Sequence, residues 1–229
     1  MADDMKEDNS KYKVELLGEN HSKEYTTYKV IILGFFSVGK TTIIGKLMNM
    51  PDKEYEPTLS LDIKNVQIKV NDKILQIQFW DTCGNDQFAG STPNLFKNAS
   101  LAILVYAIND HKSFDNLSRW YNLVKDHSFD CNLFLIGNKS DLENERDVTI
   151  KEVEDFKNNY DDIKIFFETS AKSGENMDKL FENISITLYE KLINEEKIIE
   201  DALTQRIALK KEDFPDDKEK RKKKYKKCC

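Results

Sequence analysis

Apolar runs alternate with amphipathic stretches along most of the chain, which is typical of parallel strands covered by helices. Four short runs are almost entirely apolar, at residues 28–33, 101–108, 131–136 and 163–167. Three stretches have apolar residues at helical spacing, at residues 113–127, 149–159 and 177–192. Near-continuous apolar runs predict strands buried on both faces. We therefore expect an α/β fold, with helices on both faces of a six-stranded, mostly parallel sheet.

A β-hairpin is predicted where two apolar–polar alternations follow each other. Residues 66–70 and residues 75–79 alternate in this way, and Asn71-Asp72 lies between them. Asn and Asp favour the tight turns that join paired strands. We expect this hairpin to place one antiparallel strand at the edge of the sheet.

The predicted helices carry start signals. Ser113 is expected to cap the first of them, and Thr149 with Glu152 predicts a capping box at the second. The third has an apolar stripe up to Leu192 and a fainter one up to Ile207, so we expect this helix to extend outward.

The ends of the chain differ in composition from its centre. We predict a flexible polar extension at residues 1–26, a globular domain at 27–193 and a polar tail at 194–229. The first residues lack the apolar core of a secretory signal, and no apolar stretch is long enough to span a bilayer. The net charge is −6, although residues 210–229 carry ten basic and five acidic residues. The acidic body argues against nucleic acid as a partner.

A complete phosphate-binding motif, Gly-Phe-Phe-Ser-Val-Gly-Lys-Thr, stands at residues 34–41 between a predicted strand and a predicted helix. Its glycines let backbone N–H groups turn toward phosphate oxygens, and the helix start adds partial positive charge. Lys40 is expected to reach the outer phosphates. The predicted nucleotide contacts here are Gly34, Phe36, Ser37, Val38, Gly39, Lys40, Thr41 and Thr42. The motif predicts binding of a nucleoside polyphosphate.

Three side chains with oxygen atoms are candidates for holding Mg²⁺. Thr41 ends the first loop, Asp81 follows a predicted strand, and Thr58 lies in a polar segment. Hydroxyl and carboxylate oxygens suit this cation. For Thr58 taken alone, a plain surface turn is an equally good interpretation. Gly84 can offer its backbone N–H to a γ-phosphate, because it has no side chain in the way.

Two loops after consecutive predicted strands indicate that the base is guanine. Asn138, Lys139 and Asp141 follow the 131–136 strand, and a carboxylate there can accept two hydrogen bonds from guanine. Alone, this pattern is weak in a chain rich in Asn and Lys. Residues 168–172 follow the next strand, and their predicted nucleotide contacts are Ser170, Ala171 and Lys172.

The cysteines show neither metal-ligand spacing nor a disulfide framework, which fits a reducing compartment. Two of the four, Cys228 and Cys229, follow a basic run at residues 218–227. A solvated charge run, a nuclear signal or a nucleic-acid arm is possible for the run itself. The adjacent cysteine pair favours lipidation, since a lipid with a basic patch meets the requirement for stable membrane anchoring.

With these motifs in order, residues 28–193 resemble the Ras-like small GTPases and are most similar to the Rab proteins. The similarity to Rab proteins rests on Trp80 before Asp81, on the 168–172 loop and on the terminal cysteine pair, which Rab proteins carry with geranylgeranyl groups. The resemblance implies a GTPase that binds GTP, GDP and Mg²⁺, with Tyr55 as a further nucleotide contact. It implies catalytic roles for Lys40, for Thr58 and for the position of Asn85.

The resemblance also implies a GDP/GTP switch in which residues 51–63 and 82–97 order around the γ-phosphate. Its expected partners are effectors, an exchange factor, a GTPase-activating protein, an escort protein and a GDP dissociation inhibitor. We expect a monomer at the cytoplasmic face of vesicle, Golgi or endosome membranes that cycles with the cytosol.

Four residues depart from the family pattern. Asn85 stands in place of the usual Gln that orients water, Cys83 in place of Ala, and Phe36 in place of Gly or Ser. Pro51 replaces an aromatic residue that packs on guanine, which could speed nucleotide release. A side chain shorter by about 1.5 Å misplaces the attacking water, which predicts slow intrinsic hydrolysis.

Two alternatives compete with a GTPase switch. The first is a GTP-binding, hydrolysis-deficient scaffold that is recruited to membranes and holds effectors. The second is a P-loop kinase of nucleosides or small metabolites, which would leave residues 138–141 unexplained.

Overall fold

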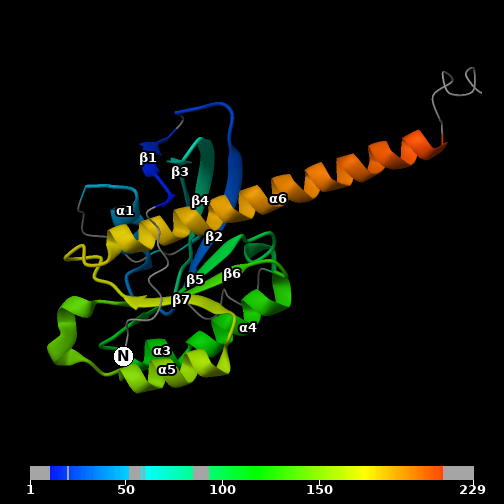
Figure 1. Cartoon of the computed structure of the whole chain (residues 1–229). Helices are drawn as coiled ribbons and strands as arrows, with labels where there is room; N and C mark the ends of the chain where they lie inside the picture. The colour runs from blue at the N-terminus through cyan, green and yellow to red at the C-terminus, as the bar shows by residue number, and fades with distance from the viewer. Residues whose placement is uncertain (1–10, 20, 52–57, 59, 85–92, 214–229) are drawn as a thin grey trace, which may run out of the picture. The chain divides into compact units, whose positions relative to one another are not determined.

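One sheet of seven strands organises the residues that the computed structural model describes, namely 11–19, 21–51, 58, 60–84 and 93–213 (Figure 1). The strands are β1 (Val14–Gly18), β2 (Thr26–Leu33), β3 (Asp62–Val70), β4 (Lys73–Asp81), β5 (Leu101–Ala107), β6 (Asn132–Asn138) and β7 (Ile163–Glu168). Their order in the sheet is β1-β3-β4-β2-β5-β6-β7. The predicted α/β fold is confirmed, with seven strands in place of the expected six.

Only β3 runs against the other six strands of this sheet. It pairs antiparallel with β4 on one side and with β1 on the other, whereas the remaining pairs are parallel. The predicted hairpin is confirmed, and Asn71 in its turn has a left-handed φ of 55°. The predicted antiparallel edge of the sheet is confirmed, although β1 pairs with the outer side of β3 and adds one more strand there.

Strand β1 lies within the segment that was predicted to be a flexible extension. That prediction does not hold for Val14–Gly18, which pair with β3 over residues 67–70. The strand has only five residues in a polar surrounding, so its local pattern is too short to predict pairing. Its pairing partner β3 is distant in sequence, and the hydrogen bonds to β3 hold these residues in the strand conformation that their local pattern does not predict.

Helices cover both faces of the sheet. They are α1 (Lys40–Leu47), α3 (His111–Asp115), α4 (Leu117–His127), α5 (Ile150–Asn159) and α6 (Met177–Asp213), with 3₁₀ turns η2 (Pro93–Leu95) and η3 (Ser140–Glu145). Helices α3, α4 and α5 pack on one face, where Trp120 and Phe114 join the core formed with β5 and β6 (Figure 1). On the other face, Ile43 and Ile44 of α1 are fully buried. Strands β5 and β6 are therefore buried on both faces, as their sequences predict.

The helix starts follow the prediction in one case and depart from it in another. Thr149 and Glu152 form the predicted capping box of α5. Ser113 is not an N-cap, because α3 begins earlier and the Asp110 carboxylate accepts from the Ser113 N–H at 3.4 Å. The Ser113 hydroxyl instead accepts from the Ala107 N–H at 3.0 Å, which joins α3 to the end of β5.

The chain divides into two compact units, the first ending at Tyr189 and the second beginning at Glu190. In the first unit, Leu180, Ile184 and Leu188 of α6 are buried, as the apolar stripe predicts. In the second unit the helix continues to Asp213, which confirms the predicted extension. Among the described residues, no helix combines the length and the apolar character that crossing a membrane requires. The predicted boundaries at residues 27 and 193 stay predictions.

Candidate functional site

The loop between β2 and α1 is pressed against the ends of β5 and β6. A Cβ atom on Gly34 would lie 2.2 Å from the Val105 carbonyl oxygen, and one on Gly39 would lie 2.4 Å from Nδ2 of Asn138. Gly39 also has a φ of 97°, which side chains rarely tolerate. Both glycines of the predicted phosphate-binding motif are therefore required by the close approach of neighbouring strands.

Lys40 lies at the start of α1 with its side chain folded back over this loop. Its Nζ donates to the carbonyl oxygen of Gly34 at 3.0 Å and to that of Phe35 at 2.9 Å. Burial lowers the pKa of Lys40 to about 8, although Asp81 and Cys83 oppose the shift. The loop thus holds a buried cation with no carboxylate bonded to it among the described residues, and phosphate oxygens would be strong acceptors for it.

Three predicted magnesium ligands lie together beside Lys40. The Thr41 hydroxyl donates to Oδ2 of Asp81 at 2.6 Å and lies 2.8 Å from the Thr58 hydroxyl. The Thr58 hydroxyl also donates to Oδ2 of Asp81, at 3.3 Å. Burial of Asp81 raises the pKa of its carboxyl group above the usual range.

The second carboxylate oxygen of Asp81 makes this cluster suitable for a cation. Oδ1 of Asp81 is buried and has no hydrogen-bond partner in the described part of the chain, and the Asp81 residue is 0% exposed. An unpaired buried oxygen is costly unless a ligand or cation satisfies it. Two hydroxyls and one carboxylate are the oxygen donors that Mg²⁺ accepts, so the residues present fit this ion. Their role as ligands stays a prediction.

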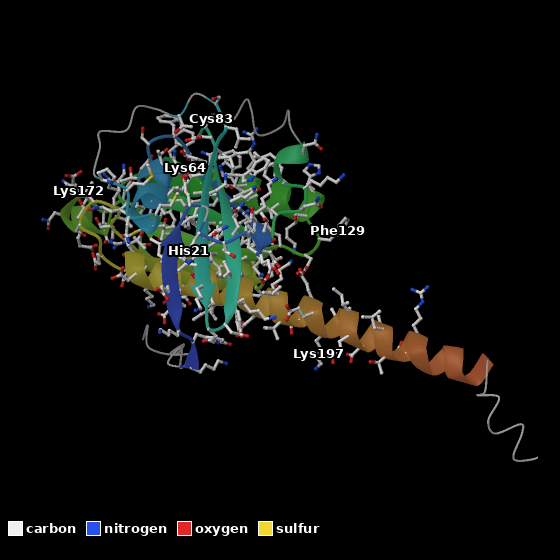
Figure 2. All side chains as sticks on the ribbon, turned by 90° about the horizontal axis from the view of Figure 1, so that it is seen from above. His21, Lys64, Cys83, Phe129, Lys172 and Lys197 are labelled. Atoms are coloured by element: carbon white, nitrogen blue, oxygen red, sulfur yellow. The ribbon has the colours of Figure 1, made fainter. Side chains whose placement is uncertain are left out.

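The chain after β4 is fastened to the first loop. The Thr82 hydroxyl donates to the Ile32 carbonyl oxygen at 2.7 Å, and Cys83 follows where β4 ends (Figure 2). A Cβ atom on Gly84 would lie 2.3 Å from the Phe36 backbone nitrogen. This close approach brings the Gly84 backbone to the loop, where the prediction requires its N–H. Thr82 was not predicted, because a hydroxyl that bonds to a distant carbonyl leaves no local sequence signal.

Phe36 occupies the surface of the loop rather than its interior. Its side chain is 58% exposed, and its ring packs 4.1 Å from that of the buried Phe35. The next residue, Ser37, is exposed and has a left-handed φ of 59°. A bulky ring therefore stands at the surface of the predicted phosphate-binding loop.

Asn138 joins three loops of the candidate site. Its Nδ2 donates to the Val38 carbonyl oxygen at 2.8 Å, and its Oδ1 accepts from the Ala171 N–H at 3.1 Å. The Thr169 hydroxyl adds a longer bond of 3.4 Å to Oδ1. All four residues are at least 98% buried. Asn138 was predicted as part of the base-reading motif, and its hydrogen bonds hold the predicted phosphate-binding loop and the two predicted base-binding loops together.

Asp141 lies beside the loop that follows β7. Its Oδ1 accepts from the Ser170 hydroxyl at 2.6 Å, and its Oδ2 lies 4.0 Å from the Lys172 Nζ. The Lys172 side chain is 84% exposed, whereas the Asp141 side chain is 22% exposed. Lys139, which directly follows β6 at the start of the loop that carries Asp141, has a left-handed φ of 69°. The structure thus brings the two predicted base-reading loops together, and guanine recognition by them stays a prediction.

An ion pair that sequence reasoning missed supports the same edge of the sheet. Arg146 donates two hydrogen bonds to the Glu168 carboxylate, at 2.8 and 2.7 Å. Glu168 is the last residue of β7, directly before the 168–172 loop turns toward Asp141. Glu143 binds the same guanidinium, and the pair of carboxylates raises the pKa of Arg146 further above its usual range. Arg146 and Glu168 are 22 positions apart, and no local sequence pattern predicts an ion pair between them.

Several predicted residues complete the site or lie outside the described part of the chain. Thr42 is half-buried in the first turn of α1, and Pro51 is exposed after it. Tyr55, Asn85, Cys228 and Cys229 lie outside the described residues. Within the described residues, no three His, Cys, Asp or Glu side chains gather as a metal site. A cation site here therefore depends on the hydroxyl oxygens of Thr41 and Thr58.

Residues 29–190 match the family model described as the Ras family. The matched range contains the first loop, the Thr41–Thr58–Asp81 cluster and both loops joined by Asn138. It begins after β1, which no part of the match covers.

Proposed function

Because the chain belongs to the Ras family of small GTPases, we propose that it is a Rab-like GDP/GTP switch that regulates vesicle transport from a membrane surface. The family supports guanine-nucleotide binding and GTPase activity in general. The Rab subfamily, the membrane anchor and a slow rate of hydrolysis are the specific parts of this proposal. A P-loop kinase gains no support from the match.

One observation carries the nucleotide part of the proposal: Oδ1 of Asp81, buried and without a partner among the described residues, lies beside two hydroxyls and the Lys40 ammonium group. Mg²⁺, when bound, supplies positive charge that neutralises phosphate oxygens. Lys40 would exchange its bonds to loop carbonyls for bonds to the phosphates. Gly84 would donate its backbone N–H next to them. These residues bind and orient the nucleotide, and the chemistry of water attack falls to the segment that begins at Asn85.

Slow hydrolysis is proposed because three departures gather around the expected γ-phosphate. Phe36 and Cys83 lie on the two chain segments that meet at Gly84, and Asn85 is the next residue in sequence. A shorter amide reaches the attacking water less well, and a misplacement of about 1 Å costs about a hundredfold in rate. Activating partners that supply their own Arg and Gln would compensate.

Single-turnover GTP hydrolysis tests this part of the proposal. We expect the wild-type chain to hydrolyse slowly and Asn85→Gln to be faster. Asn183→Gln, at a half-buried position on α6 whose side chain makes an exposed hydrogen bond, is the matched control. A wild-type rate typical of Rab proteins, unchanged by Asn85→Gln, would refute slow hydrolysis. Loss of nucleotide binding on Lys40→Ala, with binding kept in Asn183→Gln, would support the site itself.

The membrane part of the proposal rests on Cys228 and Cys229 after the basic run of residues 218–227. Replacing both cysteines by serine should leave the protein in the cytosol, whereas Cys131→Ser should leave its distribution unchanged. Persistent membrane association of the double variant would contradict a lipid anchor. The proposed partners are effectors, an exchange factor, a GTPase-activating protein, an escort protein and a GDP dissociation inhibitor.

A GTP-holding scaffold is the second candidate, and the exposed Phe36 ring favours it. A ring at this position would crowd a catalytic side chain delivered by a partner. The nucleotide found in the purified protein separates the two functions: a scaffold retains GTP, and a cycling switch retains GDP. Hydrolysis that stays slow in the presence of activating proteins would point to the scaffold.

A further inference from the structure

The N-terminal segment, residues 11–19 and 21–24, lies outside the range that matches the family, and we call it the strap. Its strand β1 runs along the outer side of β3 (Figure 1). Val14 lies opposite Val70, Glu15 opposite Lys69, and Leu16 opposite Ile68. The strap therefore occupies the side of β3 that would otherwise form the edge of the sheet.

Side-chain contacts fasten the strap on both sides of β1. The Asn71 N–H donates to the Lys13 carbonyl oxygen at 2.9 Å, and the Lys13 N–H donates to Oδ1 of Asn71 at 3.0 Å. Past β1, the Ser22 N–H donates to Oε1 of Gln67 at 2.7 Å, and Nε2 of Gln67 donates back to the Ser22 carbonyl oxygen at 3.1 Å. Gln67 thus pairs with a backbone as another strand would.

The strap is nevertheless held less firmly than the strands it covers. None of the five residues of β1 is fully buried, and its register with β3 shifts between Leu16 and Gly18. Strand β3 pairs with β4 over nine residues in continuous register. Because β3 has this complete second partner, it would keep its place when β1 leaves. The uncovered edge would then present unpaired N–H and C=O groups.

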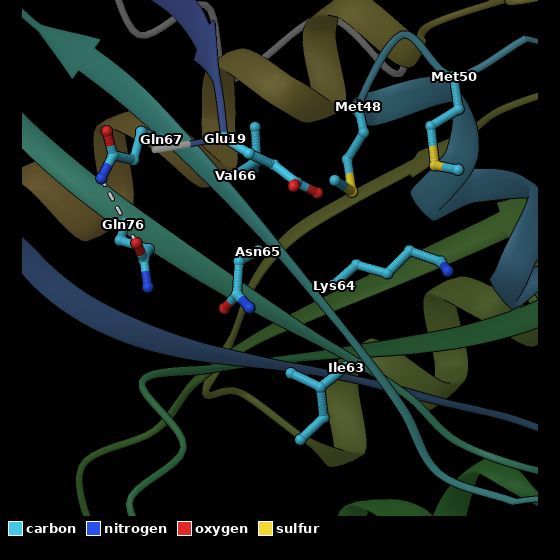
Figure 3. Close-up of a pocket in the computed structure, with 9 residues that line it drawn as sticks. All are labelled: Glu19, Met48, Met50, Ile63, Lys64, Asn65, Val66, Gln67 and Gln76. Carbon is cyan, nitrogen blue, oxygen red and sulfur yellow. Dashed lines mark hydrogen bonds between the residues drawn. The ribbon is translucent and has the colours of Figure 1, made fainter. Parts of the chain in front are cut away.

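The strap also forms one wall of a pocket with a volume of about 300 Å³. Figure 3 shows Glu19 with Met48 and Met50 along one side and Ile63, Lys64 and Asn65 along the other. Oδ1 of Asn65 is buried and has no hydrogen-bond partner among the residues that the structure describes. Departure of the strap would open this pocket on the side of Glu19, next to the uncovered edge.

We propose that the strap competes with a partner protein for the edge of β3. An extended segment can add to a sheet edge through backbone hydrogen bonds, with alternate side chains giving specificity. The strap indicates which segment fits: apolar residues at every second position, as at Val14 and Leu16, and an acidic residue between them to face Lys69. The strap then acts as a built-in competitor, and the partner binds only where it displaces β1. This competition does not depend on the proposed nucleotide cycle.

The test uses the intact chain and a fluorescent peptide of residues 11–19 as the probe. In antiparallel strands, hydrogen-bonded residue pairs alternate with non-hydrogen-bonded pairs, whose Cα atoms lie closer together. Lys13 and Asn71 form a hydrogen-bonded pair, so the next pair, Val14 and Val70, is a non-hydrogen-bonded one, and its short Cα–Cα distance suits a disulfide. Val14→Cys with Val70→Cys locks the strap when oxidised. Glu15→Pro removes the N–H that the alternation directs toward β3, and Glu15→Ala is its control.

Anisotropy should show the peptide binding Glu15→Pro about tenfold more tightly than wild type, because the free edge is more populated. The oxidised lock should not bind it, and reduction should restore the weak binding of wild type. Equal binding by the oxidised and reduced lock overturns the proposal, even where Glu15→Pro does not fold. Self-association of Glu15→Pro without peptide binding also overturns it, since the edge would then take a second copy.

Hydrogen exchange of the intact chain gives an independent measurement. Amides of β1 should exchange faster than those of β4, and protection as strong as that of β4 would overturn a displaceable strap. Binding of fluorescent GDP is measured on the same samples. Its failure in wild type would refute the proposed nucleotide function and leave the result for the strap unaffected.

Discussion

Replacing Asn138 by alanine should weaken both the fold and the nucleotide site. The change removes the donor to the Val38 carbonyl oxygen and the acceptor for the Ala171 N–H, and both partners are buried. Each buried group left without a partner costs about 1–3 kcal/mol, so we expect a loss of about 3 kcal/mol in the free energy of unfolding. That loss is about a hundredfold in the ratio of folded to unfolded protein.

Urea denaturation and the release of fluorescent GDP measure the two effects. The midpoint of unfolding should fall, and GDP should dissociate faster, because the phosphate-binding and base-binding loops lose their common tie. Asn183→Ala is the matched control, since its side chain makes one exposed bond to the Lys179 carbonyl oxygen. A change below about 1 kcal/mol in Asn138→Ala, close to that of the control, would refute the assigned role.

Three further predictions concern Gly84, Lys40 and Lys29. Gly84→Ala should speed GDP release, since its Cβ would lie 2.3 Å from the Phe36 nitrogen; release as slow as in Cys83→Ser would contradict this. Burial sets the pKa of Lys40 to about 8, and phosphates should raise it, so nucleotide binding near pH 8 should take up a proton. Equal calorimetric heats in buffers of different ionisation enthalpy would argue against that. Burial also lowers the pKa of Lys29 from 10.5 to about 8. Between pH 8 and pH 10.5 the unfolded chain therefore binds more protons at this residue than the folded chain does. The unfolding free energy of wild type relative to Lys29→Met should therefore rise from pH 8 to 10.5, and a flat difference would count against it.

Lys29 illustrates a contact that no sequence pattern indicates. It lies in β2, where the run of apolar residues predicts a strand but gives no role to its one charged member. In the structure its Nζ lies 3.6 Å above the Trp80 ring and donates to the carbonyl oxygens of Asn94 and Lys97. The cation thus ties β2, β4 and the chain around η2 together.

The sequence alone determined those features that depend on neighbours within about ten residues. The tight loop at residues 34–41, the capping box at Thr149, the hairpin turn at Asn71 and the doubly buried strands β5 and β6 all follow from local spacing and local backbone preference. Such patterns act through residues that share a helix turn or a strand face, so a short window of sequence contains them.

Tertiary structure alone decided the contacts between distant segments. Asn138 bonds to Val38 across 100 positions, and Ser22 pairs with Gln67 across 45. Strand β1 takes its conformation from β3, because the edge of β3 offers unpaired N–H and C=O groups and hydrogen bonds to them hold β1 extended. Local pattern therefore predicted the elements and the chemistry, while only the fold showed that Asn138 joins the loops and that the strap covers the sheet edge.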